Sequence, residues 1–423
     1  MAKKLKYVIE KIIVKFNVIN LSVKLNSPYL TTKIALKLIR FLNVKSDHTV
    51  LCLGRPTFNN DIAAMSELSG RINYQIVPKI IFTSIFNYYL SDILQSGIHT
   101  KYHDIKGYEK NQAKYSNYLN KFFDYFFKEI NVSGVISANY VYAWQQEIAK
   151  ICLERGIPFI VLQKEGVVAK KDYYDSLKNY TNNNFIGTKL LVYNNNLKNA
   201  FLRLKIKGLT NSKIETVGIP RFDKYFKMTP GGQNLVFFSF YVIDKIRASG
   251  LNKKITETYI NNAEKFHIEV MKFASKNKDI NVIIKTKDSE RYHNYVVNLA
   301  KDNSYINLNN LTITNNANPY NLIENSKCVI GFNSMTLIEG LMANKILISP
   351  DIIDDGVNNY FDEYPELINY ASNYFDIEKY YYGNSSNNFS LKKQIFLSDF
   401  LFKDDGKSSE RAENSILKIL EDV

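Results

Sequence analysis

The second half of the chain alternates short apolar runs with longer amphipathic segments, and this alternation limits the possible folds more than any other feature. Strands are predicted at 234–240, 280–285, 304–308, 327–332 and 345–350, and helices at 256–277, 289–301, 319–326 and 333–343. Asn318 before Pro319 is typical of a helix N-cap followed by proline at the first helical position. Strands that alternate with helices form a parallel, doubly wound sheet. Ligands bind such sheets at the carboxyl ends of the strands.

The first half is also predicted to be α/β. The run 49–53 reads as a buried strand that is stopped by Gly54-Arg55-Pro56. The segment 59–70 begins with asparagine and ends with glycine, so we expect a helix with an asparagine cap. Further strands are expected at 74–77, 133–137, 157–162 and 189–194, and further helices at 114–130 and 141–154.

The length of 423 residues exceeds what one hydrophobic core normally supports, so two domains are expected. The stretch 227–233, KMTPGGQ, carries proline and a glycine pair without an apolar pattern, and we place the hinge there. The predicted parts are a basic leader at 1–45, a first Rossmann-like domain at 46–226, a second at 227–385 and a helical tail at 386–423. Two domains of this kind would face each other across a cleft.

The three cysteines are far apart and form no CxxC pair, which predicts a reducing compartment. No apolar run reaches the roughly 20 residues of a membrane span, and the N-terminus lacks a signal-peptide pattern. The expected location is the cytoplasm.

The charge is unevenly distributed. Residues 1–45 hold ten Lys or Arg and one acid, Glu10, and the segment from 351 onward holds fifteen acids and seven bases. In residues 1–17 apolar side chains recur at helical spacing among lysines, which predicts a basic amphipathic helix. It would lie either on an anionic inner membrane leaflet or on its own domain, and the pattern does not separate the two. The absence of a nucleic-acid reading motif argues against binding to DNA or RNA.

The segment 327–350, KCVIGFNSMTLIEGLMANKILISP, is the most informative stretch for chemistry. A buried strand ends at Gly331, and a helix is expected to begin at Asn333 or Ser334. Free backbone N–H groups and the positive end of the helix dipole would then face the crevice at the strand end. With the hydroxyls of Ser334 and Thr336 nearby, this predicts a cradle for a phosphate or diphosphate. The alternative is an ordinary βα turn in which Ser334 is only a helix cap.

One turn further along the expected helix, Glu339 could accept hydrogen bonds from ribose hydroxyls. Its alternative role is that of a solvated helix residue. No G-x-G-x-x-G and no Walker loop follows any strand, which argues against dinucleotide oxidoreductases and P-loop enzymes.

Four stretches together resemble one family. GFNSMTLIEGLMANKILISP looks like the donor-binding segment of GT-B glycosyltransferases of bacterial surface polysaccharide assembly, and VGIPRFDKYF at 217–226 is similar to the GxPRxD stretch of capsule-type and CDP-glycerol-type transferases. IVLQKEG at 160–166 and GRPTFNNDIAAMSEL at 54–68 resemble strand-end loops of the same proteins. The resemblance implies a GT-B fold and spans about residues 50–350.

The resemblance also implies roles for individual residues. Donor phosphates would meet the backbone and side chains of Asn333, Ser334, Met335 and Thr336, with the ribose at Glu339. Gly331 is a donor-binding candidate from its place at the strand end. We add Ser239, in the strand at 234–240, to the donor-binding candidates. The resemblance also points to Arg221 and Asp223 as organisers of the domain junction, and we add Arg55 and Lys164 as candidates for the acceptor side of the cleft.

One departure concerns Lys285-Thr286-Lys287, where CDP-glycerol transferases usually carry a basic residue with His-Pro. A polyol-phosphate transferase is therefore disfavoured. Lys285 and Lys287 could still neutralise a donor phosphate or carboxylate, although two lysines after a strand are more often a solvated turn.

Sugar transfer needs a base near the acceptor hydroxyl and stabilisation of the departing nucleotide phosphate. Asp61 is the first candidate base, with helix capping as its alternative, and Glu165 is the second, with a surface ion pair as its alternative. No D-x-D triplet occurs, and the five histidines lack metal-ligand spacing, so neither a metal nor a cofactor is expected.

We therefore expect a metal-independent glycosyltransferase that uses a nucleotide sugar as donor and a surface polysaccharide or lipid-linked glycan as acceptor. Two alternatives stay open: a nucleotide-sugar epimerase of the UDP-N-acetylglucosamine 2-epimerase type, and a non-catalytic module of polysaccharide assembly.

Overall fold

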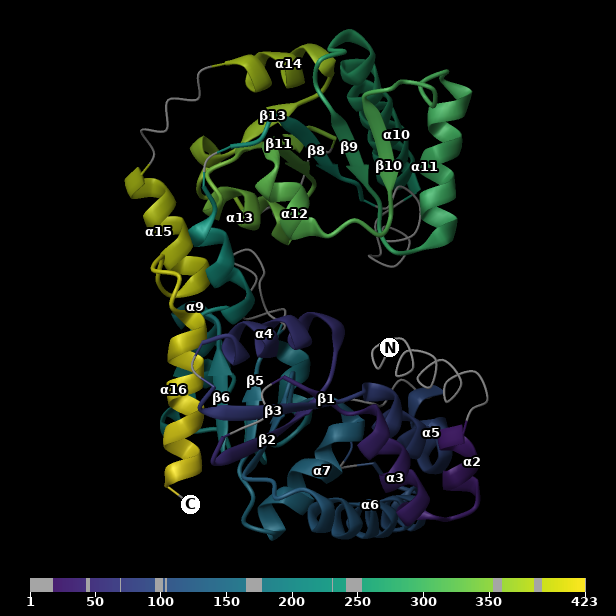
Figure 1. Cartoon of the computed structure of the whole chain (residues 1–423), viewed down its shortest axis with the longest axis vertical. Helices are drawn as coiled ribbons and strands as arrows, with labels where there is room; N and C mark the ends of the chain where they lie inside the picture. The colour runs from purple at the N-terminus through teal and green to yellow at the C-terminus, as the bar shows by residue number, and fades with distance from the viewer. Residues whose placement is uncertain are drawn as a thin grey trace. The chain divides into compact units, whose positions relative to one another are not determined.

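The computed structural model describes residues 18–42, 46–68, 70–95, 102, 105–164, 177–229, 231–240, 253–352, 360–383 and 390–422. The chain forms two compact units (Figure 1): unit 1 is Met1–Asp223 with Asp399–Val423, and unit 2 is Lys224–Ser398. The expected amphipathic helix at 1–17 and the candidate base Glu165 lie outside the described residues.

Unit 1 is built around a sheet of seven strands in the order β1-β3-β2-β4-β5-β6-β7. Its strands are β1 (Arg40–Phe41), β2 (His48–Leu53), β3 (Ile72–Val77), β4 (Gly134–Ser137), β5 (Phe159–Leu162), β6 (Lys189–Val192) and β7 (Ile214–Thr216). All neighbours pair in parallel except β1, which pairs antiparallel with β3 at the edge. The parallel arrangement expected from the alternation of strands and helices is present.

The described helices of unit 1 include a C-terminal one that returns to its sheet. They are α2 (Val18–Lys24), α3 (Pro28–Leu38), α4 (Pro56–Ser66), α5 (Lys79–Gln95), α6 (Glu109–Glu129), α7 (Ala143–Glu154), α9 (Asn195–Arg203) and α16 (Ser408–Glu421), with 3-10 turns at Lys178–Asn182 and Asn211–Lys213. Another 3-10 segment, Pro220–Lys227, continues from unit 1 into unit 2. The segment 18–41, which the sequence analysis placed in a leader, thus folds within unit 1.

Helix α16 packs on the sheet of unit 1 beside α4. Its buried side chains Ala412, Ile416 and Leu420 recur every four residues and join the core formed by β2, β3 and α4. The carboxylate of Asp223 accepts hydrogen bonds from the backbone N–H groups of Ser408 and Ser409, at 2.9 and 2.6 Å. A carboxylate at this position satisfies free N–H groups and opposes the positive end of the helix dipole. The segment expected as a separate tail therefore completes unit 1.

Unit 2 carries a sheet of six parallel strands in the order β10-β9-β8-β11-β12-β13. Its strands are β8 (Asn234–Phe238), β9 (Val282–Lys285), β10 (Leu311–Thr314), β11 (Ser326–Gly331), β12 (Ile346–Pro350) and β13 (Asn369–Ala371). Its described helices are α10 (Lys253–Lys276), α11 (Glu290–Asp302), α12 (Pro319–Glu324), α13 (Met335–Met342), α14 (Tyr374–Tyr382) and a 3-10 turn at Pro365–Leu367. Helix α15 (Ser390–Leu401) crosses the division between the units.

The helices of unit 2 pack on both faces of its sheet, as Figure 1 shows. Apolar side chains of α10, α11 and α14 form one core with alternate residues of β8, β9 and β11, such as Phe237, Ile284 and Ile330. Helix α13 packs against β11 and β12. The predicted N-cap is confirmed, because the side chain of Asn318 accepts a hydrogen bond from the Tyr320 N–H at the start of α12.

One predicted strand is wrong. Residues 304–308 form turns, and the strand is β10, further along the same stretch. Ser304 has a φ of 61°, which ends α11 in a tight turn, and Ile306 is exposed. The side chain of Asn310 donates hydrogen bonds to the carbonyls that end α10 and begin β9. Residues 304–308 and residues 311–314 are both apolar enough for a strand. The hydrogen bonds of Asn310 favour the strand at 311–314.

The predicted asparagine cap of the helix after β2 is also wrong. Helix α4 begins earlier, at Pro56, with Arg55 at the cap position. Asn59 lies inside the helix, where its side-chain oxygen accepts a hydrogen bond from the Arg55 N–H at 3.0 Å. Proline is favoured at the first helical position because its missing N–H would have no partner there.

Gly218 is predicted to be required for the close packing of the start of α16 against the segment after β7. It has a φ of +91°, and an added Cβ would lie 2.3 Å from Ser408 Oγ and 3.0 Å from the Leu401 carbonyl oxygen. We expect Gly218→Ala to lower the free energy of unfolding by about 2–4 kcal/mol, from backbone strain and the steric clash. The control is Gly156→Ala, where φ is +66° but no atom lies within 4 Å, so about 1 kcal/mol is expected. Equal losses in chemical denaturation would contradict this role.

Candidate functional site

The strand order of unit 2 places a topological switch point between β8 and β11. Counted from β8, the order is third, second, first, fourth, fifth, sixth, so the chain adds strands first on one side of β8 and then on the other. In sheets of this order the connections after the two central strands leave in opposite directions and open a crevice at their carboxyl ends. The residues directly after β8 and β11 therefore border the ligand position that the topology favours.

The turn after β11 has a strained backbone and ends at a capped helix. Asn333 has a φ of 41°, and Ser334 caps α13 by accepting a hydrogen bond from the Thr336 N–H at 3.3 Å. The hydroxyls of Ser334 and Thr336 lie 2.9 Å apart. Ser334 thus performs the capping role that the sequence left as its alternative. The positive end of the α13 dipole still lies at the carboxyl end of β11, with Met335 as the first helical residue.

The strand end also has little room for a larger residue. A Cβ added to Gly331 would lie 3.3 Å from the Leu337 side chain and 3.5 Å from Thr336 Oγ1. Glycine here lets the first turn of α13 pack closely against the end of the strand.

Glu339 lies on α13 one turn after the cap and is partly buried. The Tyr225 hydroxyl donates a hydrogen bond to Glu339 Oε2 at 2.9 Å. The Tyr225 ring contacts Tyr320, over which the Lys224 ammonium lies at 4.5 Å. These contacts orient a carboxylate, which can accept hydrogen bonds from hydroxyl groups. Tyr225 was not among the sequence candidates, although it lies within the VGIPRFDKYF stretch.

Ser239 belongs to a buried hydrogen-bond network just after β8. Its Oγ lies 2.7 Å from His267 Nε2 and 2.8 Å from the Tyr292 hydroxyl. His267 Nδ1 lies 2.7 Å from the Ala263 carbonyl and must donate to it, so in the neutral ring Nε2 accepts from Ser239. The Tyr292 hydroxyl also contacts the Phe240 carbonyl. This network holds the end of β8 in place, and it was not expected from the sequence.

The two candidate lysines after β9 differ in their surroundings. Lys285 Nζ donates hydrogen bonds to the carbonyls of Thr286 and Asn315, both at 2.8 Å, and lies 3.5 Å from Asp288. Its side chain is 11% exposed, so it fastens the loops after β9 and β10. Lys287 is exposed in the same turn.

In unit 1 the carboxyl ends of β2, β3 and β5 place three cations at one edge of the sheet. Leu53 pairs with Val77, so Arg55 and Lys79 follow neighbouring strands at matching positions. Lys164 follows β5, and its N–H donates to the Ala138 carbonyl beyond the end of β4. Burial lowers the pKa of Lys79, and the charges of Arg55 and Lys164 lower it further.

This arrangement attracts anionic groups. Arg55 also lies over the Tyr142 ring at 4.1 Å, which fixes the direction of its guanidinium. Within the described ranges, neither Arg55 nor Lys79 forms an ion pair. Lys79 was missed in the sequence analysis, although its position directly after Val77-Pro78 marks it as a strand-end residue.

Asp61 and Arg221 form a buried ion pair in unit 1. Arg221 Nη1 donates to both carboxylate oxygens of Asp61, at 3.0 and 2.9 Å, and the Arg221 backbone N–H donates to Oδ1 at 3.1 Å. Burial raises the pKa of Asp61, while the Arg221 charge opposes that rise. The Asp61 side chain is 1% exposed. These contacts favour a structural role for Asp61, which joins α4 to the segment after β7.

Metal ligation has no candidate in the part of the chain that the structure describes: no three His, Cys, Asp or Glu side chains gather there. Within the same residues, no helix is both long and apolar enough to cross a membrane.

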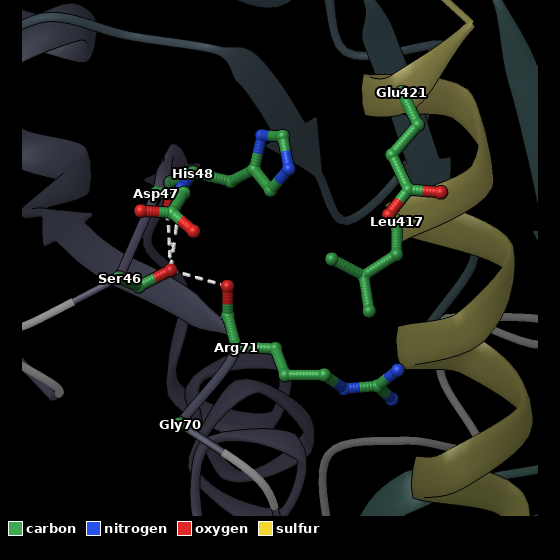
Figure 2. Close-up of a pocket in the computed structure, with 7 residues that line it drawn as sticks. All are labelled: Ser46, Asp47, His48, Gly70, Arg71, Leu417 and Glu421. Carbon is green, nitrogen blue, oxygen red and sulfur yellow. Dashed lines mark hydrogen bonds between the residues drawn. The ribbon is translucent and has the colours of Figure 1, made fainter.

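A polar pocket of about 510 Å³ opens at the opposite edge of the unit 1 sheet. His48 begins β2 and Arg71 precedes β3, so the pocket borders the amino ends of these strands. Figure 2 shows both side chains extending towards α16, where Arg71 Nη2 lies 2.7 Å from Asn414 Oδ1 and 3.3 Å from Glu413 Oε2. The pocket is lined by Ser46, Asp47, His48, Gly70, Arg71, Leu417 and Glu421. It lies away from the strand ends where ligands of such sheets bind.

Solved structures share the fold of this chain. A UDP-GlcNAc 2-epimerase from Methanocaldococcus jannaschii matches with a TM-score of 0.52 and 13% identity over 88% of this chain and 100% of that one. Another UDP-N-acetylglucosamine 2-epimerase matches with a TM-score of 0.51 and 11% identity over 89% and 95%. A glycosyltransferase from Rickettsia africae, at 16% identity over 88% and 98%, has a TM-score of 0.48, too low to support an assignment.

No protein-family model matches the sequence. No curated protein matches it significantly. The structural likeness shows the GT-B fold, as expected from the sequence, and at these identities it shows the fold alone.

The buried His267 predicts a loss of stability in acid. Burial lowers its pKa to about 4 from 6.5, so the unfolded chain binds a proton more readily than the folded chain between these values. The neutral His267 therefore contributes about 3 kcal/mol to the free energy of unfolding. This stability is fully present above pH 6.5 and is lost as the pH falls towards 4. In denaturant titrations, the wild type should lose stability more steeply over this range than His267→Gln, which does not titrate. Parallel pH profiles would show that His267 is not buried in its neutral form.

Proposed function

We propose that the chain is an enzyme acting on a nucleotide sugar, and that it transfers the sugar to a glycan or lipid-linked acceptor. The observation that carries the proposal is the turn from Gly331 to Ser334, which joins the switch-point strand β11 to the positive end of α13. Unit 2 would bind the donor through this turn. Unit 1 would bind the acceptor at its own strand ends.

The first turn of α13 would hold the donor diphosphate. The backbone N–H groups of Ser334 and Met335 at the helix start would donate to it, because the Thr336 N–H already donates to the Ser334 hydroxyl that caps the helix. The fixed helix dipole stabilises negative charge on the departing nucleotide without reorganisation during the reaction. Glu339, oriented by Tyr225, would accept hydrogen bonds from the ribose hydroxyls.

The acceptor side would use the cations Arg55, Lys79 and Lys164. They suit an acceptor that carries a phosphate or carboxylate near the reacting hydroxyl. For the base that accepts the hydroxyl proton, Glu165 follows Lys164 directly in the sequence and is the candidate we prefer. Asp61 is less suited because Arg221 occupies both of its oxygens.

A nucleotide-sugar epimerase is the second candidate. The two structures with TM-scores of 0.52 and 0.51 are named as UDP-GlcNAc 2-epimerases. An epimerase needs the same donor site but no acceptor. A role in surface or capsular polysaccharide assembly, and contact of residues 1–17 with an anionic membrane, belong to the transferase proposal and rest on the sequence.

The test separates these functions by their products. The purified chain is incubated with UDP-, CDP- and CMP-linked sugars, first alone and then with glycan and glycolipid acceptors, and the products are separated by mass and by stereochemistry. Release of nucleotide with a new glycosidic bond supports the transferase. Interconversion of the sugar nucleotide without acceptor identifies an epimerase. Donor binding without turnover on any acceptor indicates a non-catalytic module.

Glu339→Gln is predicted to weaken donor binding by about ten- to a hundredfold, because a hydrogen bond to a charged group contributes about 1.5–3 kcal/mol. The amide oxygen can still accept from Tyr225, so the fold and the melting temperature should be unchanged. Glu324→Gln, at an exposed position on α12, is the matched control. Dissociation constants are measured by calorimetry, and equal constants for wild type and Glu339→Gln would remove the ribose role.

A further inference from the structure

Helices α2, α3, α5 and α6 pack together as one layer of unit 1, as Figure 1 shows. Their inward faces are apolar and tied by polar contacts: the Thr31 hydroxyl on α3 lies 2.6 Å from Ser22 on α2 and 2.7 Å from the Tyr118 hydroxyl on α6. Helix α2 is therefore a fixed part of the fold.

The outer face of this layer exposes large apolar side chains. Leu21 on α2 is 54% exposed, and Leu25, directly after the end of this helix, is 64% exposed. Tyr29, at the start of α3, is 52% exposed, and its ring contacts Tyr125 of α6 at 5.4 Å. Leu30 beside it is also exposed. We call Leu21, Leu25, Tyr29, Leu30 and Tyr125 the outer apolar face.

The outer apolar face is surrounded by positive charge. The described segment 18–42 contains three lysines and one arginine and no acid. Two exposed acids in the C-terminal part of α6 are paired, Glu129 with Lys33 at 2.7 Å and Asp124 with Arg155 at 2.9 Å, while Glu109 lies at the other end of the helix. Lys24 and Lys128 form no ion pair with any residue in the described ranges, so the face keeps an excess of positive charge.

We propose that the outer apolar face of α2, α3 and α6 binds the surface of an anionic lipid bilayer. Leucines would enter the boundary between headgroups and acyl chains, tyrosines would lie at headgroup level, and the lysines would contact lipid phosphates. Charge complementarity favours a bilayer over a second copy of the chain, because a two-fold contact would bring identical lysines against one another. The proposal uses described residues only and does not depend on the sugar chemistry.

The test is co-sedimentation of the full chain with phosphatidylcholine vesicles, with and without phosphatidylglycerol. The wild type should bind the anionic vesicles, and binding should fall as salt is raised. Leu21→Ser with Leu25→Ser should lower the partition constant about tenfold or more, since both lose their apolar contact with lipid. Lys24→Gln and Lys128→Gln should each lower it about fivefold, from about 1 kcal/mol per basic residue.

Leu391→Ser is the matched control, because Leu391 is 66% exposed on α15 in unit 2 and should leave binding unchanged. A second reporter is Tyr29→Trp, whose emission should shift to the blue on anionic vesicles, since the native Trp144 is buried. The proposal is overturned if the wild type does not bind anionic vesicles. It is also overturned if the double leucine variant, folded by circular dichroism, binds like the wild type, because the contact then lies elsewhere. Sedimentation equilibrium that shows a dimer lost in that variant would assign the face to self-association.

Discussion

The switch of strand addition between β8 and β11 is the constraint on which the rest of unit 2 depends. A parallel sheet needs a crossover for every strand, and the crossovers leave the two central strands in opposite directions. The residues directly after each strand set the chemistry available at that point. After β8 they form a closed network around His267, and after β11 they form a helix start with an oriented carboxylate one turn later. The asymmetry between these two strand ends is the reason for proposing the donor position on the β11 side.

A short segment of unit 1, residues 217–223, performs several structural tasks. Gly218 allows α16 to approach, Arg221 neutralises the buried Asp61, and Asp223 caps α16. Removing one member of a buried ion pair leaves an uncompensated charge and costs about 3–5 kcal/mol. The same segment begins the 3-10 turn that leads into unit 2 with Tyr225, the residue that orients Glu339.

The fold could be predicted from the sequence wherever local patterns decide it. Alternating strands and helices predicted both parallel sheets, because buried parallel strands read as continuous apolar runs. The failure at 304–308 arose where two apolar runs lie one after the other, and the choice is made by distant contacts of Asn310. The packing of α16 on unit 1 could not be predicted from the sequence either. An amphipathic pattern shows which face of a helix is buried, but not which element packs against that face.

The candidate site was predicted less completely than the fold. The turn after β11 is indicated by a strand, a glycine and a helix start, all of which are local signals. Lys79 and the network of Ser239 depend on which strand ends are neighbours, and this requires the sheet order. Asp61 was chosen for its place after the first strand, but its partner Arg221 lies 160 residues away in the sequence.

Hydrogen exchange with and without a nucleotide sugar tests the central claim, that the donor diphosphate binds at the turn after β11. Amides from Phe332 to Leu337 should exchange more slowly when the donor is bound, because backbone N–H groups at a helix start would donate to its phosphates. The uncharged sugar alone should leave them unchanged. The account would be contradicted if exchange in this turn were unchanged and protection appeared instead around His48 and Arg71. The ligand would then bind at the pocket that borders the amino ends of β2 and β3 in unit 1.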